Sequence, residues 1–268
     1  IKGFPELRWT GKRPYRSTQY FPAQLRERYG EEKDGWINKI FWGDNLQVMS
    51  HMLKEYRGKI DLIYIDPPFD SKADYKKKIE VKGIGKAETD STSFEEKQYG
   101  DIWTNDGYLQ FMYERLILLK ELLSYTGSIY LHCDWHKSAH LKLLLDEIFS
   151  IDNFRNEIIW CYTGASNVGS DFPKKHDTIY RYSKTETYIF NKDCIRIPYA
   201  EGSIDRANRN VIGKGGMNFD SIILNENGKV PEDWWIDIQR AARYPGEKIN
   251  YPTQKSQKLL ERIIKASS

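Results

Sequence analysis

The sequence contains little of several features that would place a protein in a class at once. Its 268 residues include only three cysteines, Cys133, Cys161 and Cys194. Their odd number and wide spacing argue against a disulfide framework and for a reducing compartment. No apolar stretch approaches the length of a membrane span, and no basic segment followed by an apolar one marks a secretion signal. We therefore expect a soluble, cytoplasmic protein without a membrane partner.

A strong charge bias and a phosphate-binding loop are also missing. The 41 Lys and Arg residues nearly balance 38 Asp and Glu residues, for a net charge of +3. Any nucleic-acid surface must therefore come from local clustering of basic residues. Gly213, Gly215 and Gly216 follow no predicted strand and open no apolar helix, so they do not form a nucleotide-binding loop. A Rossmann-like binder of another nucleotide is therefore a less favoured alternative.

The most informative segment that is present is Asp66-Pro67-Pro68-Phe69. It follows an apolar run at 62–65, which predicts a buried strand, and two successive prolines cannot continue a sheet ladder. An acid, a rigid turn and an aromatic ring thus stand at the carboxyl end of a strand, where open α/β sheets bind their ligands. A hydrogen-bond acceptor beside an aromatic ring suits a planar substrate with an exocyclic amine.

Short apolar strands alternate with helical periodicities, which predicts an α/β fold with a mostly parallel sheet covered on both faces. Residues 70–104 are charged and lack periodicity, so we expect a long loop there. The expected strands are 40–42, 62–65, 128–132 and 157–162, with an edge hairpin formed by 178–182 and 187–190. The expected helices start at Asp44 or Asn45 and end at Gly58, start at Asp106 and end before Gly127, and cover 141–149 and 259–264.

Several segments, in a particular order, resemble one group of enzymes. Gly43-Asp44-Asn45 precedes the Asp66–Phe69 loop, residues 154–160 and 175–184 follow it, and residues 251–255 (Tyr-Pro-Thr-Gln-Lys) come near the end. Over roughly residues 7 to 268, this set resembles the permuted group of bacterial DNA amino-methyltransferases, which includes the modification subunits of restriction-modification systems. The order of the segments separates this group from RNA and protein methyltransferases with similar loops.

The resemblance implies a circularly permuted, Rossmann-like sheet that uses S-adenosylmethionine (SAM) to methylate adenine N6 in double-stranded DNA. Asp66, Pro67, Pro68 and Phe69 would be catalytic. The Asp66 carboxylate and the Pro67 carbonyl would accept the two N–H groups of the amine, and Phe69 would stack on a base flipped out of the duplex. An acid at the first position favours adenine; cytosine N4 enzymes more often carry serine there, and cytosine N4 methylation is the alternative.

By the same resemblance, the cofactor would contact both ends of the chain. Asp44 would face the adenine of SAM, and the segment near the end would border its amino-acid moiety. The family's Gly-rich SAM loop follows that segment, whereas this sequence stops at Ser268. We therefore expect a fragment that binds SAM weakly or not at all, and a non-catalytic DNA-binding remnant is the second alternative. The full set of predicted cofactor residues is Asp44, Asn45, Asp66, Pro252, Thr253, Gln254 and Lys255.

The chain divides into four predicted parts. Residues 1–36 form an N-terminal arm that packs on the domain, with a DNA contact as the alternative. Residues 37–191 form the catalytic domain with the base-binding half of the site. Residues 192–236 lack periodicity and are a candidate inserted recognition segment, whose Trp234-Trp235 pair we expect to pack on the core. Residues 237–268 carry the cofactor-side helix.

Basic residues in two of these parts are DNA-binding candidates. Lysines can contact phosphates, and arginines can also bond to base edges. The alternative for each is an ordinary solvated lysine run or loop residue. A second copy of the chain or a restriction subunit is the candidate protein partner. The DNA-binding candidates are Lys76, Lys77, Lys78, Arg206 and Arg209.

A histidine-rich stretch suggests zinc at first sight. His132-Cys133-Asp134 is followed by His136 and His140, which stand four residues apart. This spacing matches none of the usual Cys and His ligand patterns, so we expect no metal site. We interpret residues 132–134 as the end of a strand beside the pocket, where Asp134 is a candidate lining residue.

Overall fold

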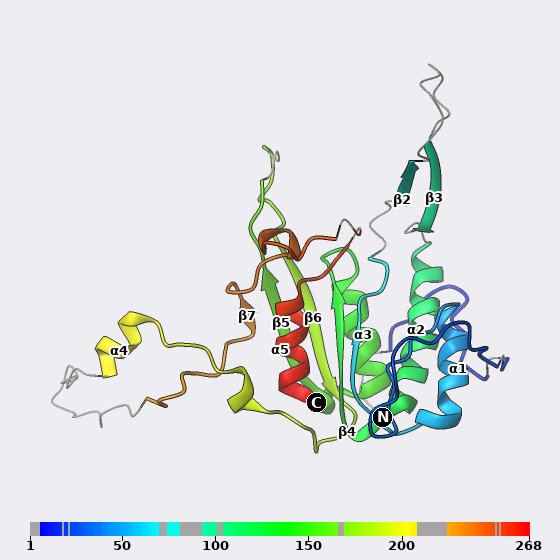
Figure 1. Ribbon diagram of the computed structural model, residues 1–268, viewed down its shortest axis with the longest axis horizontal. Helices are drawn as coiled ribbons and strands as arrows, with labels where there is room; N and C mark the ends of the chain where they lie inside the picture. Colours follow the sequence, from blue (N-terminus) through cyan, green and yellow to red (C-terminus); the bar gives the residue numbers. More distant parts are fainter. Residues whose placement is uncertain are drawn as a thin grey trace. The chain divides into compact units, whose positions relative to one another are not determined.

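The protein is described by a computed structural model (Figure 1) that covers residues 6–17, 19–20, 22–69, 74–80, 93–100, 104–165, 169–207, 224–249, 251 and 253–268. For 74–80 and 93–100 only the backbone is described. The chain forms two compact units. Unit 1 comprises Ile1–Asn156 and Asp177–Tyr188, and unit 2 comprises Glu157–His176 and Ile189–Ser268.

The sheet of unit 1 is mixed. Strand β1 (Ile60–Ile65) runs parallel to β4 (Leu123–Cys133), and β4 pairs antiparallel with β6 (His176–Ser183). Tyr64 stands opposite Tyr130 in the first pair. Because side chains alternate along a strand, each strand presents one set of residues to each face of this sheet.

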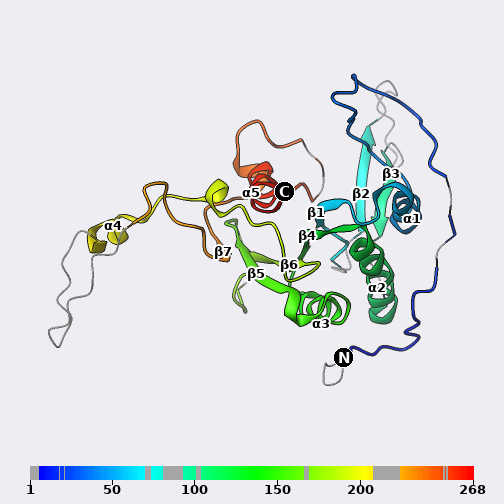
Figure 2. The same ribbon diagram turned by 90° about the horizontal axis from the view of Figure 1, so that it is seen from below.

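Three helices cover one face of this sheet (Figures 1 and 2). They are α1 (Asn45–Tyr56), α2 (Asn105–Leu122) and α3 (Ser138–Phe149). The α/β class predicted from the sequence is confirmed, and a mixed sheet with helices fits a Rossmann-like fold; the circular permutation stays a prediction. The buried core between helices and sheet contains Met49, Tyr108, Met112, Leu116, Leu141, Leu144, Leu145 and Phe149 from the helices, and Ile63, Ile129, Leu131, Cys133, Tyr180 and Tyr182 from the strands.

The helix starts show where local sequence signals are reliable. Asp44 caps α1, because its carboxylate accepts hydrogen bonds from the backbone N–H groups of the next turn, as predicted. Helix α2 is capped by Thr104 rather than by the predicted Asp106; the Thr104 hydroxyl accepts a hydrogen bond from Gly107 N at 3.2 Å. Asp106 instead lies in the first helical turn, where an acid is favoured by the helix dipole.

The predicted role of Gly127 as a helix stop is wrong. Strand β4 begins directly at Leu123, so Gly127 lies within it. A Cβ atom at Gly127 would stand 2.8 Å from the carbonyl oxygen of Ile60 and 3.1 Å from that of Asp61. Glycine is therefore required because the backbone of β1 approaches β4 closely at this point.

Two loop and strand predictions near the amino-terminal half are also corrected. The segment expected as one long loop contains β2 (Asp74–Glu80) and β3 (Ser93–Gly100), which pair antiparallel. Lys77 stands opposite Glu96 in the register of this pair. Residues 40–42 form no strand. Ile40 is 98% exposed, so its side chain does not pack against the core as that of a strand residue would.

The predicted edge hairpin near 178–190 is wrong in its second half. Residues 187–190 form no strand, and β6 pairs with β4 from Ser128–Ser183 to Cys133–Thr178. Beyond its first residue β6 is buried along its whole length, which is unlike an edge strand. The polar run at 184–187 ends β6 rather than turning it into a second strand.

Unit 2 is built around a short parallel pair and a terminal helix. Strand β5 (Phe154–Cys161) pairs with β7 (Trp234–Trp235), and helix α5 (Gln257–Ser267) starts at the cap residue Ser256. Trp235 is buried, in agreement with its predicted packing role, whereas Trp234 is half exposed. Shorter elements are α4 (Glu201–Ala207) and the 3-10 turns η1 (Ile151–Asn153), η2 (Lys192–Ile195) and η3 (Ala241–Arg243).

A backbone bridge closes the base of the candidate recognition segment. Ile197 and Lys229 exchange two hydrogen bonds of 2.8 and 2.9 Å, which joins the two ends of 198–228. Gly228 has φ +90°, and a Cβ atom there would stand 2.2 Å from the Ile197 carbonyl oxygen. Residues 208–223 within this segment lie outside the described residues. Within the part of the chain that the structure describes, no helix is both long and apolar enough to cross a membrane.

Candidate functional site

The Asp66–Phe69 loop begins where β1 ends at Ile65, so the predicted strand before it is confirmed. Asp66 is exposed, while Pro67, Pro68 and Phe69 are partly buried. The acid is thus accessible to a ligand, and the aromatic ring is held against the protein. Phe69 packs on the imidazole of His132, with the ring centroids 5.7 Å apart and the planes inclined by 39°.

A chain of three polar side chains lies directly behind this loop. The Tyr64 hydroxyl is 2.7 Å from His132 Nδ1, and His132 Nε2 is 3.0 Å from a carboxylate oxygen of Asp177. The His132 side chain is fully buried and Asp177 is nearly so. Burial raises the pKa of the Tyr64 phenol, and the charges of Asp66 and Asp177 raise it further, so the hydroxyl stays protonated.

The predicted cofactor residues of unit 1 are joined to an arginine of α2. The Asp44 carboxylate lies 3.0 Å from Arg115 Nη2, and the Asn45 amide oxygen accepts a hydrogen bond from Arg115 Nε. The Arg115 guanidinium also lies over the Phe111 ring, 3.5 Å from its centroid. Asp44 therefore caps α1 and pairs with a mostly buried cation, while half of its side chain stays exposed.

The first part of the N-terminal arm packs on α2 and α3, as predicted. Lys12 Nζ lies 2.7 Å from a Glu147 carboxylate oxygen. The Gln110 amide accepts a hydrogen bond from Arg13 N at 3.2 Å and donates one to Arg13 O at 3.1 Å. These contacts tie a segment without regular structure to two helices of the core.

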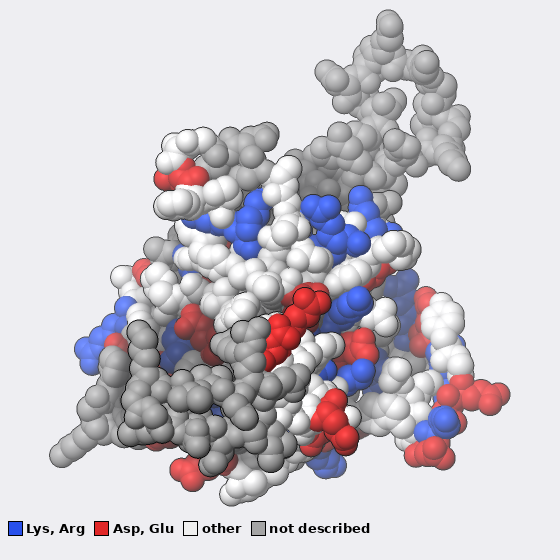
Figure 3. Space-filling model, turned by 90° about the vertical axis from the view of Figure 1, so that its left-hand side faces the viewer, with Lys and Arg blue, Asp and Glu red and all other residues white. Residues whose placement is uncertain are grey.

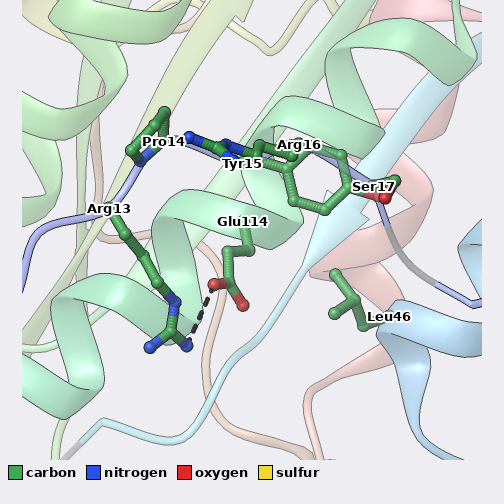
Figure 4. A pocket seen from close by; sticks show the side chains of 7 residues that line it. All are labelled: Arg13, Pro14, Tyr15, Arg16, Ser17, Leu46 and Glu114. Atoms are coloured by element: carbon green, nitrogen blue, oxygen red, sulfur yellow. Dashed lines mark ion pairs between the residues drawn. The ribbon is translucent and has the colours of Figure 1, made fainter.

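The docked arm forms two neighbouring pockets with α1 and α2. Figure 4 shows the first, of about 370 Å³, where Arg13 reaches Glu114 in an ion pair of 3.4 Å. Its lining residues come from the arm, α1 and α2: Arg13, Pro14, Tyr15, Arg16, Ser17, Leu46 and Glu114. The second, of about 440 Å³, lies at the start of α2 and is bordered by Arg115.

The predicted cofactor residues near the end of the chain belong to unit 2, whereas Asp44, Asn45 and Asp66 belong to unit 1. The Gln254 side chain donates a hydrogen bond to Glu247 O at 2.7 Å and accepts one from Ile249 N at 3.1 Å. Thr253 has φ +65°, an unfavourable conformation for a β-branched residue. Lys255 donates to Thr253 O at 3.4 Å, and Pro252 lies outside the described residues.

The DNA-binding candidates are only partly described. Lys76, Lys77 and Lys78 lie on β2, where the backbone alone is described, and the same holds for Arg206 in α4. Arg209 lies outside the described residues. Side chains of both charge signs occur over the face of the molecule in Figure 3. The DNA contacts of these five residues remain predictions.

The histidine stretch is used for contacts within the protein. Both ring nitrogens of His132 have partners in the chain behind the loop, and His136 Nδ1 lies 2.7 Å from Asp134. The His136 ring stacks on Trp135 at 3.8 Å. Among the described residues, no group of three or more His, Cys, Asp or Glu is placed to hold a metal ion. All three cysteines are free.

Sequence reasoning missed Arg115 and the roles of Tyr64 and Asp177. Arg115 lies in the predicted helix that starts at Asp106, and Tyr64 in the apolar run at 62–65, and neither was given a role in the site. Their partners are about 70 and 68 residues away in sequence. Tyr64, His132 and Asp177 lie near the ends of three strands that are separated in sequence, and only the strand register makes these strands neighbours.

Comparison with known proteins gives consistent results. A profile of the family described as DNA methylase, with N6 and N4 specificities, matches residues 60–268. The chain is 34% identical over 165 residues to the type II methyltransferase M.EcaI of Enterobacter cloacae, covering 61% of this chain and 33% of that protein. It is 26% identical over 211 residues to the Mod subunit of the Escherichia coli type III restriction-modification enzyme EcoP15I, covering 69% and 31%.

Two further matches cover more of this chain. The DNA adenine methyltransferase YhdJ of Escherichia coli strain K12 is 25% identical over 246 residues, covering 90% of this chain and 69% of that protein. The solved structure of the cytosine-N4-specific PvuII DNA methyltransferase is 12% identical with a TM-score of 0.48, covering 84% of this chain and 68% of that one. This structural likeness is too weak to bear on function. The chain spans only about a third of the M.EcaI and EcoP15I relatives.

Proposed function

This chain belongs to the DNA methylase family, and from that membership we propose that it forms the base-binding part of a SAM-dependent methyltransferase acting on adenine N6 in double-stranded DNA. The observation that carries the proposal is the Asp66–Phe69 loop at the end of β1. It combines an exposed carboxylate with an aromatic ring that is packed from behind by a buried histidine. A flipped adenine requires both an acceptor for its amine and a surface on which to stack.

The chemistry of the amine explains why an acid and a carbonyl suit this task. An exocyclic amine on an aromatic ring is a poor nucleophile, because its lone pair is delocalised into the ring. Hydrogen bonds from its two N–H groups to the Asp66 carboxylate and the Pro67 carbonyl favour the pyramidal form that attacks a methyl group. This is positioning and electrostatic stabilisation rather than covalent catalysis.

Phe69 would hold the base in that position. Extrusion of a base from the duplex costs about a few kcal/mol, and stacking on an aromatic ring returns about 1–3 kcal/mol of it. Because Phe69 is partly buried and packed on His132, little further ordering of its ring is needed when the base arrives.

SAM supplies an electrophilic sulfonium methyl group when it is bound. The half-exposed Asp44 carboxylate fits a role as acceptor for the cofactor's polar groups, since its ion pair with Arg115 holds it in orientation. Asn45 shares the same arginine. Thr253, Gln254 and Lys255 form a turn with a left-handed residue at its start, a conformation that recurs at ligand-binding segments.

DNA would be bound mainly through its phosphates. Lys76, Lys77, Lys78, Arg206 and Arg209 are the proposed contacts. The segment 192–236 is the proposed recognition element, and the Ile197–Lys229 bridge supports this by joining the backbone at the two ends of 198–228. Double-stranded DNA is the proposed substrate, and a second copy of the chain or a restriction subunit is the proposed protein partner.

Identification of the methylated nucleoside tests the proposal. DNA is incubated with SAM and the enzyme that carries this chain, digested to nucleosides and analysed by mass spectrometry. N6-methyldeoxyadenosine is the expected product. N4-methyldeoxycytidine would instead establish the alternative specificity that the family also contains. Absence of any methylated nucleoside, with DNA binding retained, would identify a non-catalytic DNA-binding protein.

A further inference from the structure

The two faces of the unit 1 sheet differ in chemistry. One face packs on α1, α2 and α3 and is apolar. The registers of β1 with β4 and of β4 with β6 show which residues lie on the opposite face, and many of these residues are polar. The opposite face carries Leu62 and Tyr64 from β1, Ser128, Tyr130 and His132 from β4, and Asp177, Ile179, Arg181 and Ser183 from β6. The chain of Tyr64, His132 and Asp177 lies on this polar face.

The hydrogen bonds among Tyr64, His132 and Asp177 suit one arrangement of donors and acceptors. A carboxylate oxygen accepts, so the 3.0 Å contact suits the tautomer in which His132 Nε2 donates to Asp177. In that tautomer His132 Nδ1 accepts a hydrogen bond from the Tyr64 hydroxyl at 2.7 Å. Both ring nitrogens of His132 are thus engaged, one by the Tyr64 hydroxyl and one by Asp177.

The imidazole of His132, which stands between Tyr64 and Asp177, also supports the Asp66–Phe69 loop. Its ring is fully buried and makes contact with Phe69 at 5.7 Å between centroids and with the Tyr64 ring at 6.1 Å. Hydrogen bonds at both ring nitrogens restrict rotation of the imidazole about its Cβ–Cγ bond. The surface on which Phe69 rests is thereby fixed in orientation.

We propose that Tyr64, His132 and Asp177 form a positioning relay that holds Phe69 in the orientation needed to stack on the flipped adenine. The inference rests on the proposed function, in that it gives Phe69 a base to hold. None of the three relay residues touches the reacting amine, so each acts through Phe69. The relay therefore serves capture of the base, and methyl transfer to the captured base depends on Asp66 and Pro67.

A spectroscopic measurement tests the relay without reference to activity. The protonation of the His132 ring nitrogens is read by long-range 1H–15N NMR on the full chain, with the signals assigned by their loss in His132→Gln. The relay predicts a proton on Nε2 and an acceptor at Nδ1, with the Nε2 proton unchanged in Tyr64→Phe because the Asp177 bond is kept. A proton on Nδ1, or on both nitrogens at neutral pH, would overturn it.

A kinetic measurement tests the role in base capture. Tyr64→Phe removes one hydroxyl and keeps the ring, and Asp177→Asn keeps the shape and removes the charge. With 2-aminopurine in place of the target adenine, each variant should show a weaker flipping signal. The KM for DNA should rise about three- to tenfold, as expected for one lost hydrogen bond, with kcat nearly unchanged. Tyr125→Phe is the matched control, because Tyr125 is 68% exposed on β4.

The outcomes separate this inference from the proposed function. If the wild-type enzyme neither flips nor methylates the base, the proposed function fails, whatever the tautomer of His132. If the wild type is active and Tyr64→Phe matches Tyr125→Phe in KM and in the flipping signal, the relay is refuted. A fall in kcat at constant KM would also refute it, because that would place Tyr64 in the chemical step. Circular dichroism checks that each variant is folded.

Discussion

Replacement of Asp44 is expected to destabilise unit 1 through two separate losses. The carboxylate accepts hydrogen bonds from Leu46 N at 3.0 Å and Gln47 N at 3.2 Å, which caps α1. It also pairs at 3.0 Å with Arg115, whose side chain is only 10% exposed. Asp44→Ala removes both contacts, whereas Asp44→Asn keeps an oxygen for the cap and removes the charge.

The expected magnitudes follow from these contacts. Loss of the cap costs about 1 kcal/mol. Loss of a charged partner for Arg115 costs about 1 kcal/mol more, less than a fully buried pair would, because Asp44 is half exposed and the Asn45 and Phe111 oxygens still bind the guanidinium. We therefore expect about 2 kcal/mol for Asp44→Ala and about 1 kcal/mol for Asp44→Asn.

Urea unfolding followed by circular dichroism measures both values. A double-mutant cycle with Arg115→Leu isolates the ion pair, since Asp44→Asn should then have almost no further effect. If Asp44→Ala lies within about 0.5 kcal/mol of the wild type, as at an ordinary surface position, the structural role assigned to Asp44 is refuted. Equal effects of the Ala and Asn replacements would refute the separate contribution of the cap.

Three further predictions concern other parts of the fold. Gly127→Ala should lower the free energy of unfolding by about 1–3 kcal/mol in urea titration, because its methyl group would meet the Ile60 carbonyl oxygen at 2.8 Å; an unchanged midpoint contradicts this close approach. Burial raises the pKa of Asp237, but the hydrogen bond and charge of Arg262 outweigh it and hold that pKa below its ordinary value of 3.8; the resulting stability is present above pH 3.8 and is lost as the pH falls through the lowered pKa. Asp237→Asn should therefore flatten the acid limb of a thermal stability profile, and an identical limb would disprove the linkage. Thr253→Gly should raise stability by about 1 kcal/mol through relief of its positive φ, measured by thermal unfolding, while a loss of stability would show that the threonine side chain makes a compensating contact.

Local signals in the sequence predicted the parts of the site that lie within one segment. The Pro67-Pro68 pair marks the end of β1 because proline cannot donate to a ladder, and the structure ends the strand at Ile65. Asp44 or Asn45 was predicted as a cap because a short polar side chain before an apolar periodic run satisfies the first N–H groups of a helix, and the structure has Asp44 in this role. Both inferences depend on neighbouring residues only.

The remaining features depend on contacts between distant segments. Strand β4 follows α2 without a loop, so the helix-stop signal expected of Gly127 had no role to play there. The pairing of β6 with β4 cannot be inferred from apolar runs alone, since the second apolar run near 187–190 looked equally suitable as its partner. The bond from Tyr64 to His132 likewise exists only through the strand register.

The exposed Asp66 carboxylate is the centre of the proposed chemistry, and its replacement is the most direct test. Asp66→Ala in the enzyme that carries this chain is compared with Asp61→Ala, which replaces an exposed acid on β1, the strand before the loop. Single-turnover transfer of a radiolabelled methyl group from SAM to cognate DNA is measured with both variants at equal occupancy by DNA. We predict that Asp66→Ala abolishes transfer and that Asp61→Ala leaves it unchanged. Retained transfer by a folded Asp66→Ala enzyme would contradict the account.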